Sequence, residues 1–176
     1  MASAAPPRKL DARTRLAALA VVATAIVLLA VVAIRLAPPG VRVAHNSVGG
    51  SAPIGTVCTH YPGAQVTIAA PAAGTIVVSA TVGVGINHTL GTADIAWVGV
   101  AESRTECGLD NYTAFVSVPA SLPSDAYHFE TVSILRPFAV SVAGPYAFYV
   151  NALMESGYDA VDRFDSASLV ATYYPS

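Results

Sequence analysis

Apolar and polar residues alternate along most of the chain after Ile54, which is the pattern of β-strands. The clearest stretch is 75–87, where every second residue is apolar and the residues between are small and mostly polar. Further stretches of this kind lie at residues 55–60, 65–69, 94–101, 113–118, 128–135, 138–142, 146–153 and 168–174. These eight or nine segments predict strands that bury one face.

Turn-forming residues separate the predicted strands, among them Pro62-Gly63, Pro137 and Gly144-Pro145. No long amphipathic helix accompanies the strands. We therefore expect an all-β fold, an antiparallel β-sandwich or jelly roll of about eight strands over residues 54–176. A segment of about 120 residues is long enough for one hydrophobic core, so one domain is sufficient.

A different pattern precedes the strands: an apolar run from Leu16 to Ile34, with Thr24 as its one polar residue. As a helix it would extend roughly 28 Å, close to the hydrocarbon thickness of a bilayer. We expect a transmembrane signal-anchor helix at 16–37. A cleaved signal peptide usually has a shorter apolar run and a small-residue processing site, and a buried soluble helix would need partners on all faces. Both remain alternatives.

Basic residues orient the expected span. Arg8, Lys9, Arg13 and Arg15 precede it, which favours a cytoplasmic tail at 1–15 and a single pass through the plasma membrane. The C-terminal domain would then be outside the cell. Residues 38–53 are rich in Pro and Gly and predict a linker between the helix and the domain.

Charge is distributed unevenly along the chain. Beyond Arg42 there is no lysine, and three arginines are set against ten acidic residues, a formal charge of −7. A nucleic-acid partner bound through a basic patch is therefore disfavoured. The lipid bilayer is the partner that the sequence indicates, through residues 16–37.

Two cysteines, Cys58 and Cys107, both fall in the segment expected outside the cell. Oxidation is allowed there, so we expect a structural disulfide between them. Two buried free thiols, or a reactive or metal-binding thiol, are the alternatives. The chain has no CxxC motif.

Candidate chemistry is sparse. Asp159, Asp162 and Asp165 recur at every third residue before the last predicted strand, and clustered carboxylates are the ligands that Ca²⁺ prefers. They are the candidate metal ligands, with a solvated turn as the alternative. The four histidines have no metal-ligand spacing, and no G-x-S-x-G motif or cofactor fingerprint occurs. No catalytic or cofactor-binding residue is predicted.

Two glycosylation sequons begin at Asn87 and Asn111, and both matter only in a host that glycosylates exported proteins. In the 75–87 segment, one face presents Ser79, Thr81, Gly83 and Gly85. Such a face permits close approach by another sheet or subunit, although glycine can also mark a bulge.

The last third of the chain resembles the closing half of a C1q/TNF-like jelly roll. The similarity rests on the Phe138–Val142 segment, the Gly144-Pro145-Tyr146 turn, the aromatic residues Phe148 and Tyr149, and an apolar segment from Ala167 to Tyr173. It covers about 35 residues, and the collagen stalk of that family is absent. The resemblance implies a homotrimer and a binding role.

Taken together, the sequence predicts a membrane-anchored, surface-displayed β-sandwich that serves binding or oligomeric assembly, with a protein or glycan ligand not identified. The alternative is an extracytoplasmic hydrolase or metal-dependent enzyme whose residues meet only in space. The fold itself supports many unrelated roles.

Overall fold

The computed structural model describes residues 21–29, 40–107, 110–123 and 127–176. The chain divides into two compact units, Met1–Pro38 and Pro39–Ser176. In the first unit, residues 21–29 are helical. Over the described ranges, no helix has both the length and the apolar character needed to cross a membrane. The rest of the expected 16–37 span, like the 1–15 tail, lies outside the described residues.

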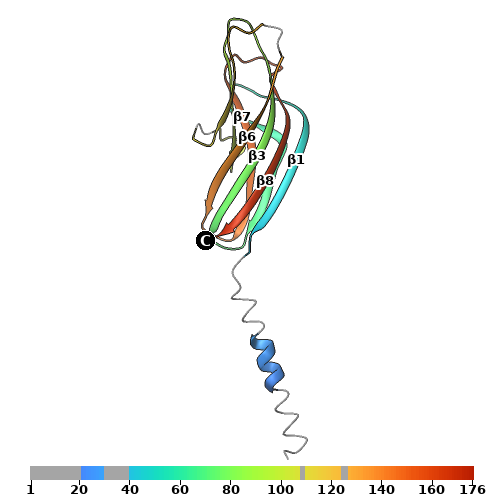
Figure 1. The fold of residues 1–176 in the computed structure, drawn as a ribbon, viewed down its shortest axis with the longest axis vertical. Coiled ribbons are helices and arrows are strands. Elements are labelled where there is room, and N and C mark those ends of the chain that lie inside the picture. The colour runs from blue at the N-terminus through green and yellow to red at the C-terminus, as the bar shows by residue number, and fades with distance from the viewer. Residues whose placement is uncertain (1–20, 30–39, 108–109, 124–126) are drawn as a thin grey trace, which may run out of the picture. The chain divides into compact units, whose positions relative to one another are not determined.

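The described part of the second unit is built from eight antiparallel strands: β1 (Arg42–Pro53), β2 (Thr59–Ala70), β3 (Gly74–Asn87), β4 (Asp94–Ala101), β5 (Ala114–Val118), β6 (Tyr127–Val140), β7 (Gly144–Ser156) and β8 (Arg163–Pro175). They form two four-stranded sheets (Figure 1). Sheet A has the order β1-β8-β3-β6, and sheet B has the order β2-β7-β4-β5. This is the double-sheet arrangement of a jelly roll, so the predicted all-β sandwich is confirmed.

The expected linker at 38–53 is wrong for most of its length, because residues 42–53 form strand β1. This strand pairs with β8 from Arg42 opposite Tyr173 to Pro53 opposite Arg163, with an irregularity between Gly49 and Ala52. Ala44 and Val48 pack against the core. Glycine and small residues conceal the strand in the sequence. Its extended conformation depends on pairing with β8, whose other side pairs with β3.

Two predicted turns are also absent. Pro137 lies inside the continuous strand β6, opposite Val77 of β3. Because β6 is an edge strand, it can accommodate a residue that lacks an N–H group. Pro62 and Gly63 lie inside β2, also an edge strand, where the pairing with β7 shifts between His60 and Gln65. Pro62 therefore lies at an irregularity in the β2–β7 pairing, whereas the β3–β6 pairing continues past Pro137, and neither proline reverses the chain.

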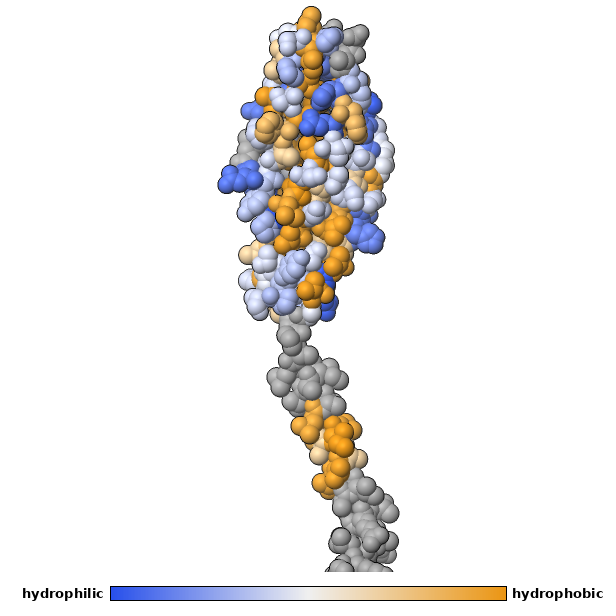
Figure 2. Space-filling view, in the orientation of Figure 1, coloured by the Kyte–Doolittle hydropathy of each residue, from blue (hydrophilic) through white to orange (hydrophobic). Residues whose placement is uncertain are grey.

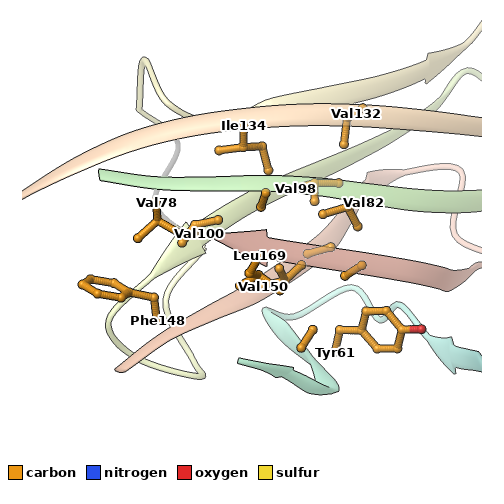
Figure 3. Packing of buried hydrophobic residues seen from close by; sticks show 14 of the residues in the cluster. Tyr61, Val78, Val82, Val98, Val100, Val132, Ile134, Phe148, Val150 and Leu169 are labelled. Carbon is orange, nitrogen blue, oxygen red and sulfur yellow. The ribbon is translucent and has the colours of Figure 1, made fainter. Parts of the chain in front are cut away.

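The core lies between the sheets and is built from the inward-facing residues of the alternating pattern. Figure 3 shows side chains of both sheets meeting there, including Val78, Val82 and Leu169 from sheet A and Val98, Val100 and Val150 from sheet B. Near one end, the ring of Tyr61 stacks on Phe164 with centroids 4.7 Å apart. The second unit thus has a hydrophobic core of its own.

Candidate functional site

The three aspartates predicted as metal ligands serve separate structural roles. Asp162, in the loop between β7 and β8, is buried and accepts hydrogen bonds from the backbone N–H groups of Asn87, at 2.9 Å, and Asp159, at 2.6 Å. Asp159 in turn accepts from the side chain of Asn87 at 3.2 Å. These bonds close the loop against the end of β3.

Asp165 lies apart from that loop, in β8. One oxygen of its carboxylate accepts from Arg163 Nε and the other from the Tyr127 hydroxyl, each at 3.0 Å. Arg163 also lies over the Tyr127 ring, 4.5 Å from its centroid. Across the described part of the chain, no group of three or more His, Cys, Asp or Glu side chains could hold a metal ion. The acidic spacing therefore does not produce a shared coordination site.

Burial is the largest influence on the Asp162 carboxyl group and raises its pKa. The two backbone hydrogen bonds act in the opposite direction, while the negative charges of Asp159 and Asp94 raise the pKa further. A carboxyl group held this way is a structural acceptor in the loop.

The residues that most resemble catalytic machinery are His88 and Asp94, and both are fully buried. His88 Nδ1 is hydrogen-bonded to Asp94 Oδ2, and His88 Nε2 lies 3.1 Å from the carbonyl oxygen of Leu122. Because a carbonyl oxygen only accepts, Nε2 carries a proton and donates it there. Both ring nitrogens are thus occupied within the protein. In the sequence, the only indication that His88 and Asp94 could interact is that they are six residues apart.

The predicted disulfide is confirmed: Cys58 and Cys107 are bonded, with their Cα atoms 5.5 Å apart. It ties the segment before β2 to the loop that follows β4. Beneath this loop, the buried Asn151 side chain donates to the backbone oxygens of Ser103, at 2.8 Å, and Glu106, at 2.7 Å. The cysteines therefore hold a loop over the outer face of sheet B.

His60 and Arg104 flank Tyr149 beside that loop. Arg104 lies 5.1 Å from the centroid of the Tyr149 ring, and the His60 ring contacts it edge-on at 5.4 Å. The pKa of His60 is lowered, mainly by burial and also by the charge of Arg104. The hydrogen bond between its ring and the Val150 carbonyl raises the pKa and only partly offsets this. This arrangement favours a neutral histidine that packs on its neighbour.

Aromatic residues form a second feature of sheet B. Trp97 of β4 lies opposite Phe115 of β5 and Leu153 of β7, and the two aromatic centroids are 5.6 Å apart. The Trp97 indole N–H donates to Glu155. Phe115 is well exposed, at 58%. These residues give sheet B an aromatic surface with an adjacent carboxylate.

The outer face of sheet A has a different character. We use the name for four cross-strand rows whose members lie opposite one another, and leave out Asp165, which lies on the same side of the sheet beside Gly85. The rows are Val43, Thr172, Val77, Pro137; His45, Val170, Ser79, Leu135; Ser47, Ser168, Thr81, Ser133; and Gly49, Ser166, Gly83, Thr131. None of these sixteen residues is acidic, and His45 is the only basic one. Val43 and Leu135 are exposed by 64% and 63%. Figure 2 shows hydrophobic and weakly polar surface over much of the lower half of the domain.

Gly83 and Gly85 of β3 lie beneath aromatic residues of the neighbouring β6. A side-chain carbon at Gly83 would lie 3.1 Å from the Phe129 ring, and one at Gly85 would overlap Tyr127. The glycines therefore admit these rings against the sheet. The Ser/Thr part of this surface remains exposed, whereas the Gly part is already covered by the chain itself.

The two sequons lie in different environments. Asn87 ends β3, and both its backbone and side-chain amide groups donate hydrogen bonds to the β7–β8 loop. Asn111 is exposed in the turn before β5. Only Asn111 therefore presents its side chain in the way that a glycosylating enzyme requires.

Comparisons with known proteins add no assignment. No protein-family model and no curated protein matches the chain. Among solved structures, a mutant VP2 protein of infectious bursal disease virus in T=1 particles is 15% identical, with 77% of this chain and 32% of that chain covered and a TM-score of 0.37. A VP2 subviral particle of the same virus is 12% identical, covering 78% and 33%, with a TM-score of 0.36.

A structure of Bacillus endospore appendages, described as disulfide-linked pili, is 12% identical, covers 80% of this chain and 95% of that chain, and has a TM-score of 0.28. This chain spans about a third of the length of the VP2 chains. At these identities and TM-scores, the similarities carry no argument about the function of this chain.

Proposed function

We propose that this chain is a single-pass protein of the cell membrane that displays its β-sandwich outside the cell and assembles with further copies of itself, without catalysing a reaction. Residues 16–37 form the anchor in this proposal, and the N-terminal tail is cytoplasmic. The outer face of sheet A is the surface through which the copies associate.

The observation that carries the proposal is the lack of charge on this face. The segment beyond Arg42 has a formal charge of −7, so two copies repel each other over most of their surfaces. The sixteen residues of the outer face of sheet A contain no carboxylate. Two copies can therefore approach here without placing like charges opposite each other, and they gain contact between exposed valine and leucine side chains.

The size of the face is suited to a modest interface. Four strands about 4.8 Å apart and seven residues of about 3.3 Å each give roughly 450 Å² per copy. Two such faces together bury about 900 Å², which is below the roughly 1,200–2,000 Å² of stable specific interfaces and in the range of weak ones. Anchoring in one membrane increases the effective concentration of the copies, so a weak interface is sufficient for assembly.

Two further observations support display outside the cell and a non-catalytic role. The bond between Cys58 and Cys107 is of the kind that persists in oxidising compartments. The His88–Asp94 pair, which has the residue types of an acid–base centre, is buried with both histidine nitrogens engaged. It offers a substrate no free nitrogen.

Cysteine cross-linking tests the assembly in the full chain. Both native cysteines are bonded to each other, so a single introduced thiol reports its own neighbours. We expect Ser79→Cys, on the outer face of sheet A, to yield cross-linked species in membranes treated with a short thiol-reactive linker. Ser117→Cys, exposed on β5 of sheet B, is the matched control. The mass of the product distinguishes a dimer from the trimer implied by the C1q/TNF resemblance.

Charge insertion gives the second arm of the test. Leu135→Asp should abolish the Ser79→Cys product by placing carboxylates in the contact, while the protein still reaches the membrane. Equal cross-linking at Ser79 and Ser117 would reject this face as the interface, as would cross-linking of Ser79→Cys only to another protein. Protease added to intact cells should remove the C-terminal domain, and full protection would reverse the proposed topology.

A further inference from the structure

One end of the sandwich is formed by four segments that contain almost no charge. β1 begins there, β2 passes into β3, β6 passes into β7, and β8 ends (Figure 1). The register brings these segments together, since Arg42 lies opposite Tyr173, Gly74 opposite both Pro175 and Val140, and Ala70 opposite Gly144. We call residues 41–43, 70–74, 140–144 and 174–176 the proximal end.

The proximal end is apolar at its surface. Its exposed large side chains are Val41 at 59%, Val43 at 64%, Val142 at 64% and Tyr174 at 47%. Arg42 is the only charged side chain in the four segments, and none of the ten acidic residues beyond Arg42 lies in them. Asp159 and Asp162 belong instead to the loop between β7 and β8, at the opposite end of those strands. The acidic domain therefore has one end that an anionic surface does not repel.

The start of β1 makes this end close to the proposed anchor in the sequence. Five peptide links separate Ala37, the last residue of the expected span, from Arg42. Fully extended, they reach at most about 18 Å. The polar headgroup layer occupies roughly 5–8 Å on each side of the hydrocarbon core. The start of β1 can therefore lie at most about 10–13 Å beyond the headgroup layer, a much shorter distance than a sixteen-residue linker would allow.

We infer that the proximal end docks on the headgroup layer of the membrane that holds the anchor. This inference rests on the proposed membrane anchoring. Tyr174 places an amphipathic ring where tyrosine is favoured, at the boundary between lipid and water, and the three valines enter the same layer. Arg42 lies among them as the group that interacts with lipid phosphates. Docking leaves the outer face of sheet A free for other copies except at Val43, which belongs to both surfaces.

Fluorescence quenching tests the docking with the full chain in vesicles of phosphatidylcholine and phosphatidylglycerol. An environment-sensitive dye on Val142→Cys reports the proximal end. The matched control is the same dye on Val161→Cys, because Val161 is also exposed, at 50%, but lies in the loop between β7 and β8. With lipids that carry a quencher at headgroup depth, we expect at least a twofold greater loss of fluorescence at residue 142 than at residue 161.

A charge variant supplies the second readout. Tyr174→Asp should reduce the quenching at residue 142 towards the value at residue 161. Resistance to alkaline extraction from the vesicles shows that the anchor is inserted. If the protein resists extraction but quenching is equal at residues 142 and 161, the docking is wrong and the anchor stands. Release of the protein by alkaline extraction would overturn the anchor and, with it, the docking that depends on it.

Discussion

The carboxylate of Asp162 accepts a hydrogen bond from the backbone N–H of Asn87 at 2.9 Å, although the two residues are 75 positions apart. The bond joins the end of β3 to the loop between β7 and β8. The sequence predicted a different role for each residue: Asp162 as a metal ligand and Asn87 as a glycosylation site.

The raised pKa of Asp162 predicts a specific pH dependence of stability. An acid whose pKa is higher in the folded protein keeps its proton longer when folded, so its contribution is greatest below the ordinary value of 3.8 and is lost as pH rises through the folded pKa. We expect the free energy of unfolding of the wild type, relative to Asp162→Asn, to fall across that window. Denaturant titrations of both proteins at a series of pH values measure it. A difference that grows with pH would contradict the assignment.

Gly157 is predicted to be intolerant of a side chain. Its φ is +69°, and a Cβ atom there would overlap the buried Asp94 carboxylate. Gly157→Ala should therefore cost about 3 kcal/mol or more, since overpacking adds to the left-handed backbone penalty of about 1–2 kcal/mol. Gly91→Ala is the control, because Gly91 has a φ of +88° and no atom within 4 Å of the Cβ position. Similar denaturation midpoints for the two variants would show that Asp94 exerts no steric restriction.

Reduction of the disulfide should lower the melting temperature of the domain. Cys58 and Cys107 are 49 residues apart, and closing a loop of that length contributes about 4 kcal/mol in the chain-entropy model. Thermal melts with and without reductant, together with a Cys58→Ser/Cys107→Ser variant, provide the measurement. An unchanged melting temperature after complete reduction would mean that the bond adds nothing to stability.

Glycosylation should distinguish the two sequons in a host that modifies exported proteins. Asn111 is exposed in a turn, whereas the Asn87 side chain is hydrogen-bonded to Asp159 and is followed by the buried His88. We expect Asn111→Gln to remove the glycan mass and Asn87→Gln to leave it unchanged. Retention of the glycan in Asn111→Gln would show that the modification precedes folding at Asn87.

Periodicity predicted the strands of this protein where alternation is strong. The segment at 75–87 became β3, because residues such as Ile76 and Val82 have a single low-energy position, facing the other sheet. It failed at β1, where the residues are small and the extended conformation depends on pairing with β8, more than 100 residues later. It also failed at Pro137, since only the strand order shows that β6 is an edge.

The all-β class, the single pair of cysteines and the acidic, lysine-free character of the domain follow from local patterns and composition, so they could be predicted from the sequence. Which side chains meet depends on the tertiary structure. It separated Asp165 from Asp159 and Asp162, paired His88 with Asp94 in the interior, and brought together on sheet A four rows of residues without carboxylates. The physical reason is that these relationships depend on strand order and register, which are set by contacts between residues far apart in the chain.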